Sequence, residues 1–294
     1  MEWLKRLNNA LNYIEENLDQ KIEYEKLTQI AGCSVYHFQR MFSYMAEMPL
    51  SEYIRNRRLT KAALDLQRGE KVIDVAIKYG YESPTAFNRA FQKFHNVSPS
   101  KAQKEGTFLK ARPPISFKIM IKGVEQMEYS IVKKDKMRIV GAKILLNNGK
   151  DGDMESSIAE NFKIVPEFWQ TVGQDGRLAK IVSAMDSKSK GVLGVSACMA
   201  NVESWEYYIA VETDKELVEG LEEYIIPANT WAVFKGKGVM PTAIQEVEKR
   251  IVTEWLPTSG YEYADAPDIE VYLNQDHTNS QFEVWIPVNE ADNS

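Results

Sequence analysis

The sequence predicts a chain of two domains of different class, an α-helical N-terminal domain followed by an α+β domain. Through about the first hundred residues, apolar side chains recur at helical spacing. Beyond Arg112-Pro113-Pro114 they alternate with a period of two, which is typical of strands. A length of 294 residues also suits two domains of ordinary size. We expect domains at 1–108 and 127–289, a linker at 109–126 and a tail at 290–294.

One pattern occurs twice in the N-terminal domain. SVYHFQRMF at 34–42 and SPTAFNRAF at 83–91 share Ser, Phe, Arg and Phe at the same offsets. Each serine is suited to cap a helix, and each pair of phenylalanines, four residues apart, lies on one helix face. Arg40 and Arg89 lie about 200° round the helix axis from a phenylalanine, so we expect them to point outward. Each copy follows a short helix and a turn, which predicts two helix-turn-helix units whose second helices can enter the DNA major groove.

The spacing between the two units has a physical reason. The segment LSEYIRNRRLTKAALDLQRG, which follows Pro49 and ends at Gly69, predicts one long helix. About twenty residues span roughly 30 Å at 1.5 Å per residue, close to the ~34 Å of one turn of B-DNA. The long helix can therefore set two recognition helices into successive major-groove segments, on an asymmetric and bent site of roughly two turns. One chain then suffices, so we expect a monomer, although a dimer through the second domain stays open.

The C-terminal half contains two related units. Its period-two segments are RIVGAKI, GVLGVSACM, SWEYYIAVE, NTWAVFKG, DIEVYL and QFEVWIPV. Helical patterns near 155–172 and 242–256 interrupt them, so the order strand, helix, strand, strand appears twice. The closing segments EYYIAV at 206–211 and EVWIPV at 283–288 are also similar in sequence. We expect an α+β domain of two pseudo-symmetric β-α-β-β repeats.

Three of these strands each carry a carboxylate two residues before an aromatic side chain. The pairs are Glu206 with Tyr208, Glu270 with Tyr272, and Glu283 with Trp285. We expect the three pairs to share one face of the sheet, opposite an aliphatic face. Aromatic rings attract cations and a partly buried carboxylate supplies the opposite charge, so this face suits a lipophilic cation. The alternative is an exposed sheet face with cross-strand aromatic pairs and solvated glutamates.

Charge differs between the two halves. Residues 1–110 hold 17 Lys and Arg against 13 Asp and Glu, whereas 111–294 hold 19 against 29. This asymmetry favours a polyanion as partner of the first half and a cation as partner of the second. The sequence has neither a long apolar run nor a secretory leader, and it has only two cysteines, Cys33 and Cys198. We expect a cytoplasmic protein without a membrane span, a metal, a cofactor or a catalytic residue.

Residues 5–105 resemble the AraC/XylS family of bacterial transcription regulators, especially its double helix-turn-helix members of the MarA and Rob type. GCSVYHFQRMF, PLSEYIRNRRLTKAALDL, DVAIKYGYES and FNRAFQKFHNVSPSKAQ carry the resemblance. It implies base contacts from each recognition helix, by Tyr36, Gln39 and Arg40 in the first and by Thr85, Asn88 and Arg89 in the second. Phosphate contacts are expected from Arg55, Arg57 and Lys93. Promoter DNA and RNA polymerase are the partners that the resemblance implies.

Residues 127–289 resemble the GyrI-like effector-binding domain. IPANTWAVFKGKG, EWLPTSGYEYADAPDIEVYLN and FEVWIPV carry this resemblance. It implies a groove between the two repeats that binds small, often cationic and aromatic molecules, with Glu270 and Glu283 meeting the cation. The further candidates for this groove are Glu206, Trp169, Tyr208, Trp231, Tyr272 and Trp285.

The sequence therefore predicts a DNA-binding transcription regulator that responds to a small organic effector, and not an enzyme. Two alternatives stay open. Some GyrI-like domains hydrolyse reactive small molecules, and a glutamate in the groove could activate a water for this purpose. In the other alternative, the C-terminal domain binds no small molecule and serves only to dock a protein.

Overall fold

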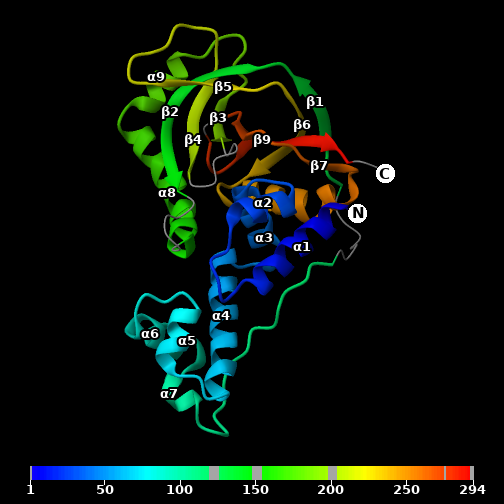
Figure 1. Cartoon of the computed structure of the whole chain (residues 1–294). Helices are drawn as coiled ribbons and strands as arrows, with labels where there is room; N and C mark the ends of the chain where they lie inside the picture. The colour runs from blue at the N-terminus through cyan, green and yellow to red at the C-terminus, as the bar shows by residue number, and fades with distance from the viewer. Residues whose placement is uncertain (1, 119–125, 148–153, 198–203, 275, 292–294) are drawn as a thin grey trace.

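The computed structural model describes residues 2–118, 126–147, 154–197, 204–274 and 276–291. It shows two lobes that one long helix connects (Figure 1). Part of the predicted linker (119–125), Cys198 and the end of the predicted tail (292–294) lie outside the described residues. Within the described ranges, no helix is both long enough and apolar enough to cross a membrane.

The N-terminal region contains the two predicted helix-turn-helix units. Its helices are α1 (Glu2–Glu16), α2 (Tyr24–Ala31), α3 (Val35–Ala46), α4 (Leu50–Gln67), α5 (Val72–Lys78), α6 (Pro84–His95) and α7 (Pro99–Ala102). The first unit is α2 with α3, and the second is α5 with α6. Between them, the 18 residues of α4 span about 27 Å. The predicted arrangement of two units on one long helix is therefore confirmed.

The repeated motif forms the same local structure in both units. Ser34 and Ser83 each accept a hydrogen bond from the backbone N–H three residues later, at 3.2 Å in both cases. The phenylalanines of the motif are fully buried, as their spacing predicts; they are Phe38, Phe42, Phe87 and Phe91. Gly32 ends α2 with a φ of 69°, a conformation that glycine adopts without strain. The motif therefore encodes a cap, a core face and an outward face.

Loss of either serine cap is expected to have a modest and similar effect. We expect Ser34→Ala and Ser83→Ala each to lower the free energy of unfolding by about 1 kcal/mol, because one helix N–H loses its acceptor. Denaturant unfolding of the two variants measures this. A loss in only one of them would show that the two caps are not equivalent.

The C-terminal lobe is one antiparallel sheet with helices on one face. Its strands are β1 (Tyr129–Lys134), β2 (Met137–Asn147), β3 (Val192–Ala197), β4 (Ser204–Glu212), β5 (Glu222–Ile226), β6 (Asn229–Gly238), β7 (Tyr261–Tyr263), β8 (Asp268–Tyr272) and β9 (Ser280–Glu290). The helices are α8 (Met154–Gln174), α9 (Arg177–Ser183) and α10 (Thr242–Arg250), and short π and 3-10 turns over Ile251–Trp255 and Leu256–Thr258 continue α10. The strand order is β1-β6-β9-β8-β3-β4-β2-β5, with β7 beside β9.

The sheet order shows the internal repeat. One unit runs β2-α8-β3-β4 and the other β6-α10-β8-β9. In the sheet, β2-β4-β3 is the counterpart of β6-β9-β8, and the two units meet where β3 pairs with β8. The predicted pair of β-α-β-β repeats is confirmed. The sequence reading missed β1, β5, β7 and α9; β1 and β5 form the two edges of the sheet.

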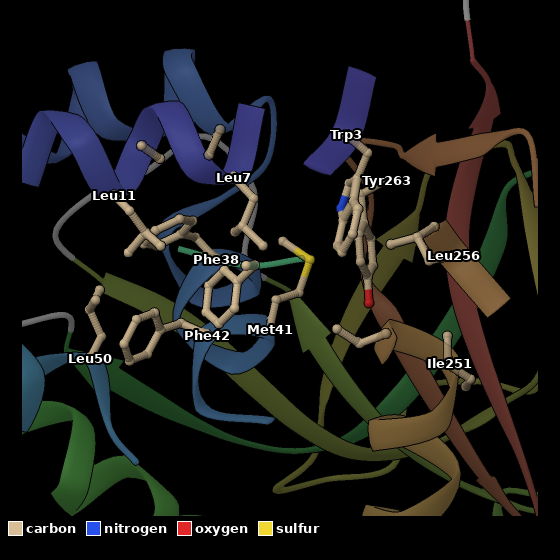
Figure 2. Close-up of a cluster of buried hydrophobic side chains, with 14 of the residues drawn as sticks. Trp3, Leu7, Leu11, Phe38, Met41, Phe42, Leu50, Ile251, Leu256 and Tyr263 are labelled. Atoms are coloured by element: carbon tan, nitrogen blue, oxygen red, sulfur yellow. The ribbon is translucent and has the colours of Figure 1, made fainter. Parts of the chain in front are cut away.

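The hydrophobic cores do not follow the predicted boundary at residue 108. One cluster joins α1, α2 and α3 to β6, β9 and the segment after α10. In Figure 2, Trp3 and Met41 lie beside Tyr263, Ile251 and Leu256. A separate cluster holds the second half of α4 together with α5, α6 and α7. The first helix-turn-helix unit is thus packed on the C-terminal lobe, whereas the second lies at the far end of α4 (Figure 1).

Candidate effector cavity and DNA-contact helices

A cavity of about 800 Å³ lies on the helix-covered face of the sheet, near the junction of the two repeats. Strands β4 and β8 contribute Trp205, Tyr207, Glu270 and Tyr272 to its lining. Helices α8, α9 and α10 line it further, and so does α3 from the first helix-turn-helix unit. The cavity therefore lies where the first helix-turn-helix unit packs on the C-terminal lobe.

Glu270 is the acidic group of the β-sheet wall. Its carboxylate accepts a hydrogen bond from the Tyr272 hydroxyl at 2.7 Å and a long one from the Tyr207 hydroxyl at 3.5 Å. The Trp169 indole N–H donates to the Tyr207 oxygen at 2.9 Å, and its ring lies 5.0 Å from the Tyr272 ring, edge to face. Two tyrosine hydroxyls thus contact one carboxylate, and Trp169 packs against both tyrosines.

Gly194 makes this arrangement possible. It lies directly opposite Glu270 on the neighbouring strand β3. A Cβ atom at this position would lie 2.4 Å from the Tyr207 hydroxyl oxygen and 2.9 Å from Glu270 Oε2. Any larger residue would push the tyrosine and the carboxylate apart, so the small residue is part of the site.

The protonation of these groups follows from their burial. Burial raises the pKa of Glu270 above its ordinary value, against the opposing effects of the Arg40 guanidinium and of the hydrogen bond from Tyr272. Burial likewise raises the pKa of Tyr207 and of Tyr272, so both hydroxyls keep their protons and can donate to the carboxylate. The site can therefore present either a carboxylate or, at lower pH, a neutral acid.

The expectation that three carboxylate–aromatic pairs share one sheet face is wrong. Residues directly opposite each other in an antiparallel pair project to the same face. Ile269 pairs with Trp285 and Val271 with Glu283, which places Glu283 on the face opposite Glu270. Three further residues of the predicted set lie with Glu283 on that second face, namely Glu206, Tyr208 and Trp285.

These residues are engaged away from the cavity. The Trp285 indole N–H donates to Glu283 at 2.8 Å, and Lys143 pairs with Glu206 at 2.8 Å. Trp231 is fully buried, and its N–H donates to the Pro267 carbonyl at 3.2 Å. Of the residues predicted to bind an effector, the cavity brings together Glu270, Tyr272 and Trp169.

The α3 wall of the cavity consists of the residues expected to contact DNA bases. Tyr36, Gln39 and Arg40 all line the cavity. The Tyr36 ring lies 4.4 Å from the Trp205 ring, and Gln39 and Arg40 are only 3% and 9% exposed. Our expectation that Arg40 is exposed is therefore wrong: it points away from its own helical core, but the C-terminal lobe covers it.

Arg40 lies among acidic side chains of the C-terminal lobe. Its guanidinium forms ion pairs with Asp268, at 3.2 Å, and with Glu248. The same Asp268 oxygen lies 2.8 Å from His37 Nε2, and the Tyr44 hydroxyl donates to Glu248. Burial alone would lower the pKa of Arg40, but its phenolic and acidic neighbours raise it, so the guanidinium stays charged. We call Asp268 and Glu248 the carboxylate clamp.

The second recognition helix is in a different environment. In α6, the expected DNA-contact residues are exposed; they are Thr85, Asn88, Arg89 and Lys93. Among the residues that the structure describes, the C-terminal lobe lies at the other end of α4 from this helix (Figure 1). Of the residues expected to contact phosphate from α4, Arg57 is 7% exposed and binds Glu15 at 2.6 Å, and Arg55 is partly buried. Arg57 would have to leave Glu15 to reach a phosphate, so the structure does not present it as expected.

Sequence reasoning missed several residues of the site. Tyr207 and Trp205 line the cavity from β4, and Asp268 and Glu248 form the carboxylate clamp. The period-two pattern of β4 did place Tyr207 on the face opposite Tyr208. The sequence did not show that this face of β4 is the one on which Glu270 lies in β8. In the part of the chain that the structure describes, no group of three or more His, Cys, Asp or Glu side chains could hold a metal ion.

Comparison with known proteins agrees with both halves of this architecture. Residues 130–288 match the family of integron-associated effector binding proteins, Cass2, and residues 27–105 match a helix-turn-helix domain family. The transcriptional activator AarP of Providencia stuartii is 38% identical over 95 residues, which are 32% of this chain and 70% of AarP. The multiple antibiotic resistance protein MarA of Escherichia coli is 34% identical over 96 residues, which are 32% of this chain and 76% of MarA. A solved structure of SAV2435 bound to tetraphenylphosphonium is 23% identical with a TM-score of 0.47, over 55% of this chain and 94% of that one.

The doubled helix-turn-helix and the sheet domain with its cavity define the class of DNA-binding transcription regulators that carry an effector-binding domain. More particularly, this chain belongs to the AraC family, and its C-terminal domain belongs to the family of integron-associated effector binding proteins.

Exposed Arg89 gives the most direct test of the DNA contacts. We expect Arg89→Ala to weaken binding to the specific site by about 1–3 kcal/mol, because an arginine forked on a guanine contributes about this much. Gel shifts at fixed salt, on a duplex selected from a random pool with the full chain, measure the change. Lys93→Ala, as a phosphate contact, should weaken all sequences alike; unchanged specificity in Arg89→Ala would contradict the base contact.

Proposed function

We propose that this regulator senses a small lipophilic cation, which binds beside Glu270 in the cavity of the C-terminal lobe. The observation that carries the proposal is the geometry around Glu270: one carboxylate lies among Tyr207, Tyr272 and Trp169 in a cavity of about 800 Å³. A volume of this size holds a drug-sized molecule. Aromatic faces and a carboxylate together favour a cation whose charge is spread over an apolar surface.

The test is a titration of the full-length chain with lipophilic cations, beginning with tetraphenylphosphonium, and with the neutral analogue triphenylphosphine oxide. The fluorescence of Trp169 and Trp205, which line the cavity, reports binding. Saturable binding of cations without conversion supports the sensor. Conversion of a compound would instead favour the hydrolase alternative, in which Glu270 activates a water. No binding by any cation would contradict the proposal and favour a protein-docking role.

Cation binding should depend on pH through Glu270. Its pKa lies above the ordinary 4.5, so the carboxylate is lost at a higher pH than in a solvated glutamate. We expect cation affinity to fall as the pH falls through this raised pKa, with the neutral analogue unaffected. The sign for stability is opposite: the native state binds the proton more tightly than the unfolded state, so Glu270 lowers stability as the pH rises from 4.5 through the raised pKa. Titrations between pH 5 and 8 check the first effect, and Glu270→Gln should abolish the pH dependence.

The remaining partners follow from the family. We propose that α6 contacts bases through Thr85, Asn88 and Arg89, and that Lys93 contacts phosphate. Contact with RNA polymerase, which the resemblance implied, stays a prediction.

A further inference from the structure

The two recognition helices differ in what covers them, although their sequences follow one motif. Arg40 and Arg89 occupy the same position of the motif. Arg89 is exposed, whereas Arg40 is 9% exposed and paired with Asp268 and Glu248. Since the guanidinium cannot bind these carboxylates and a base at the same time, the two sets of contacts exclude each other.

The contact that covers α3 combines charge with apolar packing. His37 stacks on Tyr263 with ring centroids 4.7 Å apart, in addition to its contact with Asp268. At the rim, Glu47 pairs with Lys249 at 2.7 Å, and Arg6 of α1 pairs with Glu262 at 2.7 Å. Every named ion pair across this contact joins the N-terminal helices to the C-terminal lobe, so they all stabilise one docked arrangement.

We propose that the C-terminal lobe withholds the first recognition helix from DNA. In the docked arrangement, Tyr36, Gln39 and Arg40 face the cavity, and the chain reads DNA through α6 alone. Release of α3 adds the second half-site. The carboxylate clamp is thus an autoinhibitory contact, in which Asp268 and Glu248 take the place that DNA would occupy on Arg40. This proposal rests on the expected DNA contacts of α3 and does not depend on which effector binds.

Footprinting tests the proposal without any effector. On a duplex selected from a random pool with the double variant Asp268→Asn/Glu248→Gln, we expect the wild-type chain to protect about one helical turn from hydroxyl radicals. The double variant Asp268→Asn/Glu248→Gln removes the charges that hold Arg40, and should protect a second turn and bind at least tenfold more tightly. The matched control is Asp265→Asn/Glu246→Gln, which neutralises two exposed carboxylates close in sequence to the clamp. Two protected turns with the wild-type chain, or no difference between the two double variants, would overturn the proposal.

A zero-length cross-link decides the question in the wild-type chain, even if the double variant folds poorly. Glu47, which directly follows α3, and Lys249 of α10 form an exposed ion pair, so a carbodiimide can join them as an amide. We expect the same yield of this cross-link in the free chain and in the complex with DNA. Lys249→Arg keeps the charge but cannot form the amide, which identifies the product by mass spectrometry. Loss of the cross-link when DNA binds would show that DNA alone releases α3, and the proposal would then be wrong.

Discussion

Replacing Arg40 with methionine is expected to release α3 from the C-terminal lobe without any gain in DNA affinity. Methionine keeps much of the apolar stem but leaves Asp268 and Glu248 buried without their counter-charge. Removing one partner of a buried ion pair typically lowers stability by about 3–5 kcal/mol. Separation of α3 from the C-terminal lobe relieves this penalty, because it exposes the two carboxylates to water. The yield of the Glu47–Lys249 cross-link should therefore fall in this variant.

The control is the same substitution at the equivalent position of the second unit. Arg89→Met should leave the cross-link yield and the unfolding free energy unchanged, because the side chain is exposed. Arg89→Met should lose a base contact that the docked chain makes, whereas Arg40→Met removes a contact that only the released helix could make. The two sides of one ion pair therefore have opposite effects on DNA binding: Asp268→Asn releases an intact Arg40, whereas Arg40→Met releases a helix that has lost it. An unchanged cross-link in Arg40→Met would show that apolar packing alone holds α3.

The elements of the N-terminal domain could be predicted because their determinants are local. Ser34 and Ser83 cap helices, Phe38 and Phe87 define core faces, and Gly32 permits the turn. All of these depend on residues within one or two turns of each other. The repeats of the C-terminal lobe could be predicted for the same reason, because segments with the period of a strand and segments with the period of a helix follow each other along the chain. Edge strands such as β1, with most of its residues exposed, have no clear alternation to read.

The arrangement of the cavity could not be predicted, because it depends on strand register. Alternation within β8 and β9 separates two faces of each strand correctly. It does not say which face of β8 continues into which face of β9, and a shift of one residue exchanges them. The observed register aligns Val271 with Glu283, which sends Glu270 to the helix-covered face and Glu283 to the other. The space that Gly194 on β3 leaves for Tyr207 and Glu270 likewise becomes visible only once the register is known.

Burial of the first recognition helix is also a non-local property. The residues that SVYHFQRMF and SPTAFNRAF share do not tell their outer faces apart, and the structure shows that Tyr36 and His37 contact Trp205 and Tyr263. The difference comes from Asp268 and Glu248, more than two hundred residues away in the chain, and from the apolar cluster that includes Trp3 and Tyr263. The sequence motif therefore predicts which contacts a recognition helix can make with DNA. Only the tertiary structure shows that other residues of the chain occupy the same side chains.

The choice of glutamate can be tested directly. Glu270→Gln is expected to weaken the binding of lipophilic cations by about 1.5–3 kcal/mol, which is about 10- to 150-fold, because it removes the negative charge of Glu270 from the cavity. Glutamine has the same size, and its carbonyl can still accept the hydrogen bond from Tyr272, so the cavity should keep its shape. Affinity for the neutral analogue triphenylphosphine oxide should not change. Fluorescence titration of both ligands, at a pH above the raised pKa of Glu270, measures the difference.

Glu206→Gln is the matched control for this prediction. Glu206 also lies two residues before a tyrosine and accepts its hydroxyl, but it projects from the opposite face of the sheet. If the cavity is the cation site, this variant should bind cations as the wild-type chain does. Equal losses in Glu270→Gln and Glu206→Gln would mean that the negative charge of the whole lobe attracts cations, rather than one carboxylate. A loss confined to Glu206→Gln would move the binding site to the other face, where Trp285 and Tyr208 lie.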